Sequence, residues 1–325
     1  MKLLSSIGGY TLKVLVTGAA GFIGSHVVQV LLEQQFTVVA VDNLSTGKRD
    51  RIPTGVKFYE MDVTNNDVGN IFTNEQPDYV IHLAHQIAVC DSKLKPMKDE
   101  HASLLGTLNI LRLSNEYKVK KCIFASSAAV YGNSSILPSK EDSKLAPRSF
   151  LTLCKLSAEN YVQLYKKLFG LNSCILRFSN VFGPTQTNGV IISFLNCLLD
   201  GESPVIFNDG HQTRDFIYVK DAAAACIQAL ISESTGVFNI STSTEISIQQ
   251  VFEELTRITG IQTNPVYETL REEEINRSVL SNEKAMSTFN WNPVYSLASG
   301  LEETVRETEL TRMGGLFGAR SDKII

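Results

Sequence analysis

Short apolar segments alternate with longer amphipathic ones over the first half of the chain. Strands are expected at residues 13–17, 37–41, 57–60, 79–83, 121–125 and 173–177. Helical periodicity is found at residues 25–33, about 97–117 and 150–169. Because apolar strands that alternate with helices are typical of buried parallel strands, we expect a parallel sheet covered by helices on both faces.

After residue 178 the alternation gives way to loops, short helices and isolated strands. A chain of 325 residues is also longer than a single hydrophobic core usually supports. We therefore expect an α/β fold with a doubly wound parallel sheet over residues 11–178. A smaller α/β domain is expected over residues 179–313, interleaved with the first, and a flexible tail over residues 314–325.

The composition is that of an ordinary folded protein, with 43% hydrophobic and 20% charged residues. A net charge of −4 gives no electrostatic reason to expect nucleic acid or an anionic membrane as partner. The first ten residues lack a signal-peptide core, and no apolar run is long enough to span a bilayer. The six cysteines are dispersed without a metal-ligand spacing, so we expect free thiols, a cytoplasmic location and no metal.

The first expected strand leads directly into a glycine-rich turn. Residues 17–24 have the spacing G-x-x-G-x-x-G, followed by the start of a helix. Small residues let the backbone approach a pyrophosphate, and a helix N-terminus offers amides and the positive end of its dipole. In this strand–turn–helix context the motif predicts a Rossmann-type dinucleotide site. The residues expected to contact the cofactor here are Gly18, Gly21, Phe22, Ile23 and Gly24.

An acidic residue, Asp42, ends the second expected strand. Its carboxylate can accept hydrogen bonds from the adenosine ribose hydroxyls and would repel a 2′-phosphate. The position therefore predicts NAD, although the nearby Lys48 and Arg49 leave NADP open. The loop that follows contributes further expected cofactor contacts at Asn43, Leu44, Ser45 and Gly47.

Two hydroxyl residues, Ser126 and Ser127, follow a later strand, and a helix carries Lys155 four residues after Leu151. This spacing brings Leu151 and Lys155 onto one helix face. Together the segments resemble the active site of the extended short-chain dehydrogenase/reductase family, especially its nucleotide-sugar 4-epimerase branch. Members of that family use a serine or threonine, a tyrosine and a lysine, the last two as Tyr-x-x-x-Lys. Leu151 occupies the position of the tyrosine.

The resemblance implies that Ser127 orients the substrate hydroxyl beside Ser126, and that Lys155 binds the nicotinamide ribose of NAD. Ser127 and Lys155 are therefore expected as catalytic residues. Leucine has no exchangeable proton, so the proton transfer made by the family's tyrosine is lost or redirected. His85 is a candidate replacement because histidine titrates near neutral pH. A polar loop residue that faces the pyrophosphate is an equally compatible interpretation of His85.

Two other side chains are weaker candidates as proton carriers. Tyr131 matches a structural tyrosine of the family, and Cys154 is expected to be a packed helix residue. The resemblance also implies contacts to the dinucleotide from the segments around residues 62 and 84. These contacts are expected at Asp62, Val63, Leu83, Ala84, His85 and at Ser103, which replaces a family asparagine.

The second half of the chain carries the expected substrate contacts. By resemblance, Asn180, Arg214 and Arg271 contact a nucleotide-diphosphate sugar, and the guanidinium fork of arginine suits a diphosphate. Ala128 and Ala129 stand where related dehydratases carry acids, so dehydration is disfavoured. A homodimer that pairs the helices at 97–117 and 150–169 is also implied.

Three functional hypotheses follow. The first is an epimerase-like enzyme with NAD and a UDP-sugar, whose proton transfer at the sugar C4 is altered. The second is a non-catalytic protein that binds NAD and a nucleotide sugar in a regulatory or partner role. The third is an enzyme on a different biosynthetic substrate. The fold alone does not decide between them.

Overall fold

The computed structural model describes residues 6–7, 10–85, 104–269 and 275–321. Its largest layer is a seven-stranded sheet in the order β13-β8-β7-β6-β3-β4-β5. All neighbouring strands in this sheet are parallel, as the apolar pattern predicted. The strands are β3 (Lys13–Thr17), β4 (Thr37–Asp42), β5 (Lys57–Glu60), β6 (Tyr79–His82), β7 (Lys121–Ser127), β8 (Ser173–Phe178) and β13 (Gly236–Ile240).

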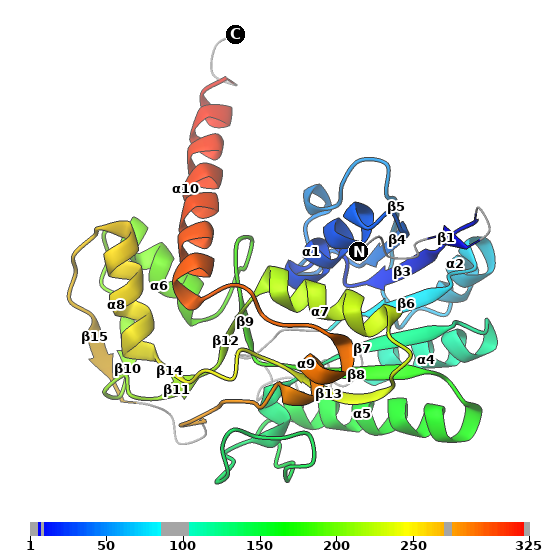
Figure 1. Cartoon of the computed structure of the whole chain (residues 1–325). Helices are drawn as coiled ribbons and strands as arrows, with labels where there is room; N and C mark the ends of the chain where they lie inside the picture. Colours follow the sequence, from blue (N-terminus) through cyan, green and yellow to red (C-terminus); the bar gives the residue numbers. More distant parts are fainter. Residues whose placement is uncertain (1–5, 8–9, 86–103, 270–274, 322–325) are drawn as a thin grey trace.

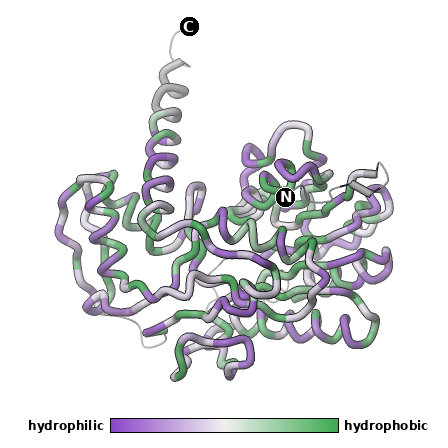
Figure 2. Tube along the Cα trace, in the orientation of Figure 1, coloured by the Kyte–Doolittle hydropathy of each residue, from purple (hydrophilic) through white to green (hydrophobic). Residues whose placement is uncertain are grey.

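Helices cover both faces of this sheet (Figure 1). Alternate side chains of β3 enter different cores, with Val14 and Val16 on one face and Leu15 on the other. The first core is completed by α1 (Phe22–Glu33), α7 (Val219–Ile231) and α9 (Glu283–Phe289). The second is completed by α2 (Val68–Glu75), α4 (Gly106–Glu116) and α5 (Phe150–Phe169). The central strands are accordingly hydrophobic along most of their length (Figure 2).

The elements after residue 178 that do not pack on the large sheet form a second layer. This layer has a hydrophobic core of its own, built mainly from α6, α8, α10 and the strands β9 and β12. Its elements are β9 (Asn180–Phe182), α6 (Val190–Leu199), β10 (Val205–Phe207), β11 (Thr213–Arg214), β12 (Phe216–Tyr218), β14 (Ile246–Ser247), α8 (Ile248–Thr259), β15 (Val266–Glu268) and α10 (Leu297–Ser321). The short pair β1 (Ser6–Ile7) and β2 (Tyr10–Thr11) precedes the main sheet.

The division between the large sheet and the second layer does not follow the order of the chain. Both β13 and α7 come after residue 178, yet they belong to the large sheet and its helical cover. The helix α10 continues to Ser321, so much of the segment that we expected to be a flexible tail is helical. Between the layers, the Arg51 guanidinium donates to the carbonyl of Thr185 at 2.8 Å.

Helix α5 has the bounds that its periodicity predicted, and its ends explain why. The Ser149 hydroxyl accepts from the amide of Thr152 at 3.2 Å, and the Thr152 hydroxyl accepts from the amide of Ser149 at 3.0 Å. This reciprocal capping box satisfies amides that the first helical turn leaves unpaired. Gly170 ends the helix with a φ of 73°. Leu151 and Lys155 therefore lie on the first two turns of a helix whose N-terminus is capped.

The single tryptophan, Trp291, is buried beside α7. Its indole N–H donates to the carbonyl of Asp221 at 3.1 Å. The carboxylate of the same aspartate accepts from the amides of Val294 and Tyr295, each at 3.0 Å. Asp221 thus holds the segment that leads from α9 into α10 against the helical cover of the large sheet.

Among the residues that the structure describes, none of the helices combines the length and apolar character needed to cross a bilayer. Within the same residues, no group of histidine, cysteine, aspartate or glutamate side chains could hold a metal ion.

Candidate functional site

A cleft of about 1370 Å³ lies at the carboxyl ends of the parallel strands. The strand order reverses here, because the chain passes from β3 outward to β4 and later returns to β6 on the other side. Ligands of doubly wound sheets bind at such switch points. The volume exceeds the roughly 300–1,000 Å³ of common small-molecule pockets, so the cleft has room for an extended ligand.

The glycine turn forms one wall of the cleft. Gly18 has a φ of 67°, and a Cβ there would lie 2.6 Å from the amide nitrogen of Ala84. Only glycine therefore allows this turn to approach the loop after β6 so closely. The rest of the expected motif, at the N-terminus of α1, also borders the cleft: Gly21, Phe22, Ile23 and Gly24.

Asp42 is buried at the end of β4 and borders the same wall. Its carboxylate accepts from the amide of Ala20 at 3.0 Å and from that of Leu44 at 2.8 Å. Leu44 does not itself border the cleft, and neither does Gly47, where a Cβ would lie 2.8 Å from the Asp42 carboxylate. Leu44 therefore orients the Asp42 carboxylate through its backbone amide, and glycine at position 47 leaves room for that carboxylate.

The two basic residues that left NADP open lie away from the cleft wall. The Arg49 guanidinium stacks 4.5 Å above the ring of Phe58 and donates to the carbonyl of Ile52 at 3.3 Å. Neither Lys48 nor Arg49 borders the cleft. The carboxylate of Asp42 is therefore the charge that a ribose beside β4 would meet, which favours NAD.

Asn43, Ser45, Asp62 and Val63 also border this end of the cleft. The amide of Asn43 donates to the Asp62 carboxylate at 2.7 Å. The other carboxylate oxygen of Asp62 accepts from the amide and the hydroxyl of Thr64, at 2.8 and 2.6 Å. The two loops that follow β4 and β5 are thus joined at this end of the cleft.

A buried histidine that the sequence did not single out positions the loop after β6. The two ring nitrogens of His82 form hydrogen bonds with the hydroxyls of Thr17, at 2.6 Å, and Thr107, at 3.1 Å. Burial lowers the pKa of His82 to about 3, so the ring is neutral. The Thr17 hydroxyl also accepts from the amide of Ala84 at 3.3 Å. This contact orients the loop at Leu83, Ala84 and His85, which border the cleft.

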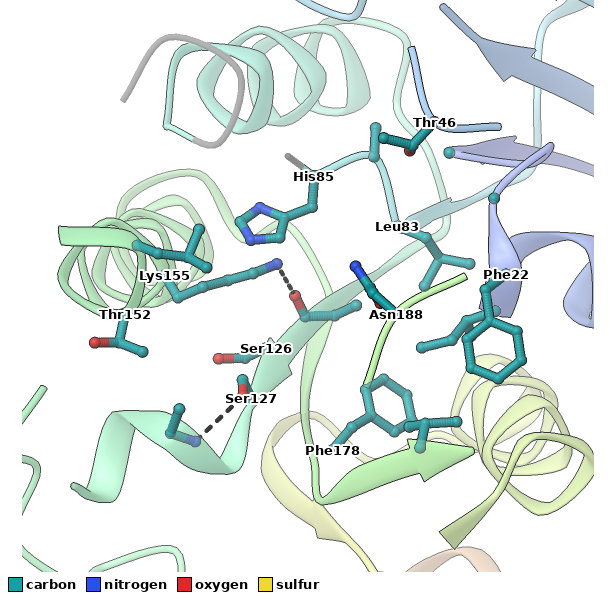
Figure 3. A pocket seen from close by; sticks show the side chains of 18 of the residues that line it. Phe22, Thr46, Leu83, His85, Ser126, Ser127, Thr152, Lys155, Phe178 and Asn188 are labelled. Atoms are coloured by element: carbon teal, nitrogen blue, oxygen red, sulfur yellow. Dashed lines mark hydrogen bonds between the residues drawn. The ribbon is translucent and has the colours of Figure 1, made fainter. Parts of the chain in front are cut away.

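Lys155 extends from α5 to the far end of the cleft (Figure 3). Its ammonium group donates to the carbonyl of Ala125 at 2.6 Å. Burial lowers the pKa of Lys155 to about 7, while nearby Glu159 acts in the opposite direction. The imidazole of His85 lies on the same side of the cleft as the lysine (Figure 3). Burial and the charge of Lys155 lower the pKa of His85 well below its usual value.

A chain of buried polar groups lies behind this end of the cleft. Ser126 donates to Glu159 at 2.5 Å, and the Glu159 carboxylate is held by Arg177 at 2.6 Å. Arg177 also donates to the phenol oxygen of Tyr131 at 2.9 Å, and Tyr131 donates to Asn239 at 2.7 Å. The phenol of Tyr131 is therefore engaged on both sides, in keeping with a structural role, and it does not border the cleft.

Leu151 presents a partly buried apolar side chain to the cleft, next to Phe150 and Thr152. The Ser127 hydroxyl borders the cleft as well and accepts from the amide of Ala129 at 3.2 Å. Ser127 and Lys155 thus converge from β7 and α5 on one region, as their motifs led us to expect. Cys154 is buried and does not border the cleft.

The second layer contributes Asn180 and Arg214 to the lining of the cleft. The backbone N–H of Asn180 donates to the carbonyl of Asp215 at 2.8 Å, and the Arg214 guanidinium donates to the carbonyl of Thr213 at 2.8 Å. These two expected substrate contacts therefore line the same cleft as the glycine turn. The expected cofactor contact Ser103 and the expected substrate contact Arg271 lie outside the described residues.

The sequence did not single out the turn between β9 and α6 as part of the site. Gln186, Asn188 and Gly189 border the cleft, and the side chain of Asn188 points into it (Figure 3). The segment is polar and follows a Gly-Pro pair, which is the composition of a surface turn. That signal was available, but it does not distinguish a ligand-binding turn from a solvated one.

Comparison with known proteins agrees with this geometry. Residues 14–241 match the model of the NAD dependent epimerase/dehydratase family. The UDP-glucose 4-epimerase of Mycolicibacterium smegmatis is 32% identical, with 90% of this chain and 97% of that protein covered. The chain belongs to the NAD dependent epimerase/dehydratase family.

Solved members of the family have the same architecture. The structure of the Thermotoga maritima UDP-glucose 4-epimerase with UDP-glucose has a TM-score of 0.90 at 37% identity, covering 93% of this chain and 100% of that one. The Thermus thermophilus UDP-glucose 4-epimerase in complex with NAD has a TM-score of 0.86 at 34% identity, covering 92% and 99%. The chain is accordingly an NAD-dependent enzyme of the epimerase/dehydratase class.

The residues of this family member fit NAD. The Gly18 turn leaves no space for a Cβ, as a close pyrophosphate approach requires, and the buried Asp42 carboxylate is fixed for a ribose. At the other end of the cleft, Lys155 and the apolar side chain of Leu151 both border the cavity from α5.

Proposed function

We propose that this chain is a UDP-sugar 4-epimerase in which proton transfer at the sugar C4 is altered by Leu151. The observation that carries the proposal is the continuity of the cleft. The same cleft is lined by the glycine turn and Asp42 and also by Asn180, Arg214 and Lys155. A dinucleotide and a nucleotide sugar could thus meet end to end beside Lys155.

The cofactor site is proposed to consist of the residues expected from the sequence. The turn at residues 18–24 would receive the pyrophosphate at the N-terminus of α1, Asp42 the adenosine ribose, and Lys155 the nicotinamide ribose. When bound, NAD supplies a hydride acceptor that oxidises the sugar at C4 and later returns the hydride. The protein's own task is to orient the sugar and to move the hydroxyl proton.

The sugar nucleotide is proposed to lie against the second layer. Arg214 carries a planar donor fork suited to a diphosphate, and Asn180 lies beside it on the cleft wall. Ser127 would donate its hydroxyl proton to a sugar oxygen, because its own oxygen already accepts from Ala129. The UDP-sugars bound or converted by the relatives support this choice of substrate class.

A second candidate is a non-catalytic protein that binds NAD and a nucleotide sugar. Leu151 favours it, because positioned acid/base catalysis contributes roughly 10²–10⁴-fold to a rate and leucine contributes none. An enzyme acting on another substrate in the same cleft is the third candidate.

The assembly is proposed to be a homodimer that pairs α5 and the preceding helix. Large apolar side chains on α5 are exposed, with 38% of Tyr161, 44% of Leu164 and 60% of Leu168 accessible. The three lie at helical spacing on one face.

We also propose that the boundary between an NAD domain and a substrate domain lies at residue 178. The proposed location of the protein is the cytoplasm.

Purified protein tests the proposal directly. It should retain NAD or bind it on titration, bind UDP in calorimetry, and interconvert a 4-epimeric pair such as UDP-glucose and UDP-galactose. Binding of both ligands without conversion of any UDP-sugar in a panel would support the non-catalytic candidate. Failure to bind either ligand would refute the proposal as a whole.

A further inference from the structure

The reaction end of the cleft needs a group that can take a proton. Oxidising the C4 hydroxyl breaks the O–H bond while the C4 hydrogen leaves as a hydride. Leu151 stands where the family has its tyrosine, and its alkyl side chain has no exchangeable proton. If the proposed function holds, on which this inference rests, the proton must pass to another side chain.

The hydroxyl groups near this point are engaged elsewhere. Ser126 donates its proton to Glu159 at 2.5 Å, and Tyr131 donates to Asn239 at 2.7 Å outside the cleft. A serine hydroxyl such as that of Ser127 is too weak a base to remove a proton from a sugar alcohol without help. The His85 ring is a weak base, because burial and Lys155 hold its pKa well below neutral.

Lys155 differs from these groups in what surrounds its nitrogen. One N–H is directed to the Ala125 carbonyl at 2.6 Å, which fixes Nζ at the edge of the cleft. The carboxylate one turn later on α5, Glu159, is occupied by Arg177 and Ser126. Among the described residues, no carboxylate forms an ion pair with Lys155.

We propose that Lys155 itself is the proton carrier of this site and takes over the role of the missing tyrosine. The lone pair of its neutral amine accepts the proton of the sugar C4 hydroxyl. The O–H bond breaks, an Nζ–H bond forms, and the C4 hydrogen departs with its electron pair toward the bound nicotinamide. On the return the hydride rejoins C4 from the other face, and the ammonium gives its proton back to the ketone oxygen.

The charges around Lys155 are compatible with this role. His82 and His85 face it from the end of β6, and both have lowered pKa values, so neither adds a charge at neutral pH. Glu159 lies behind it on α5, where its carboxylate is paired with Arg177, and it raises the pKa of Lys155 less than burial lowers it. Burial brings the pKa of Lys155 to about 7, so amine and ammonium coexist near neutral pH, where proton transfer is most effective.

Replacing Lys155 by arginine separates proton transfer from positioning. Arginine keeps a positive charge and N–H donors but does not deprotonate in proteins. In Lys155→Arg we expect NAD affinity within about threefold of wild type and turnover lower by about 10²–10⁴-fold. The matched control is Lys167→Arg, an exposed lysine on the same helix, which should leave turnover unchanged. The double variant Leu151→Tyr/Lys155→Arg should regain turnover, because the phenol then carries the proton beside a fixed positive charge.

A readout independent of turnover is the titration of Lys155 itself. In ¹⁵N-lysine-labelled holoenzyme, the Nζ resonance that is absent from Lys155→Arg should titrate with a midpoint near 7. A midpoint near the ordinary lysine value of about 10.4 would overturn the proposal.

Three kinetic outcomes also count against it. Turnover retained in Lys155→Arg would show that Lys155 does not carry the proton. Loss of turnover in His85→Gln with unchanged NAD binding, together with retention in Lys155→Arg, would assign the role to His85. A wild-type protein that binds NAD and UDP-sugars but converts none would overturn this inference and leave the proposed binding sites standing. Absence of NAD binding would instead refute the proposed function.

Discussion

Glu159 follows Lys155 by one helical turn, yet its carboxylate binds Arg177 at 2.6 Å instead of the lysine. At i, i+4 spacing a glutamate and a lysine commonly pair. Here the pairing is diverted into the buried chain behind β7 and β8. The lysine is thereby left at the cleft with a carbonyl as its hydrogen-bond acceptor. The reactivity proposed for Lys155 therefore depends on Glu159 being paired with Arg177.

The first prediction concerns the pH dependence of stability in Lys155→Met. Folding lowers the pKa of Lys155 to about 7, whereas in the unfolded chain it is near its ordinary value of about 10.4. Between these values the unfolded chain holds a proton that the native protein has released. The free energy of unfolding of the wild type therefore rises with pH in this window, by at most about 1.4 kcal/mol per unit.

Methionine has no such proton. The free energy of unfolding of Lys155→Met minus that of the wild type should therefore be largest below pH 7 and should decrease toward about pH 10. Urea unfolding of the ligand-free proteins across this range measures the difference. Lys167→Met on the exposed side of α5 is the control, and its curve should run parallel to that of the wild type. A parallel curve for Lys155→Met would contradict the lowered pKa.

Gly18→Ala should abolish tight NAD binding. A Cβ at Gly18 would lie 2.6 Å from the amide nitrogen of Ala84, so the turn must shift away from the loop after β6. Gly170→Ala is a matched control, because that glycine has a similar φ of 73° with nothing within 4 Å. Both variants should lose about 1–2 kcal/mol of stability from the positive φ. Calorimetry should show at least about a hundredfold loss of NAD affinity only in Gly18→Ala, and equal losses would refute the steric argument.

Arg214→Gln should weaken UDP binding by about 10–100-fold, the loss expected when hydrogen bonds to a charged group disappear. NAD affinity should stay the same, because Arg214 lies on β11 of the second layer, whereas the glycine turn connects β3 to α1. Titration with UDP avoids any dependence on turnover. The control is Arg257→Gln on α8, where the arginine is exposed and paired with Glu254. Unchanged UDP affinity in Arg214→Gln would remove Arg214 from the proposed site.

Leu164→Glu should convert the proposed dimer into a monomer. The side chain is 44% exposed on α5 and lies at helical spacing from Tyr161 and Leu168. Because the interface is two-fold, each protomer contributes one buried glutamate to it. Burying these two charges makes association unfavourable. Gln163→Glu adds the same charge to an exposed position on another side of the helix. Sedimentation velocity should separate the two variants, and a wild type that sediments as a monomer would contradict the dimer itself.

The sequence predicted the parallel sheet because its strands are buried on both faces and form continuous apolar runs. It missed α2, whose apolar residues Val68, Ile71 and Phe72 span too few turns to show a clear period. It also did not predict that β13 joins the large sheet, because strand partners far apart in the chain leave no local signal.

The cofactor residues could be predicted from the sequence, because the glycine spacing of residues 18–24 and the acid at Asp42 reflect backbone geometry. The buried polar groups behind the site could not be predicted in this way. His82 looked like part of an apolar strand, and its hydrogen bonds with Thr17 and Thr107 join three separate segments. Likewise, the diversion of Glu159 to Arg177 depends on β8 lying beside β7. Such partners become visible only when the strands are placed side by side.

The burial of Trp291 gives the protein an internal optical probe. It is the only tryptophan, and its indole donates to the carbonyl of Asp221 inside the core. Selective excitation of this ring will therefore report one location. Its emission should be that of a shielded indole and should shift to the red when the segment before α10 separates from α7. Fluorescence will thus follow the attachment of the C-terminal helix, while circular dichroism follows the chain as a whole.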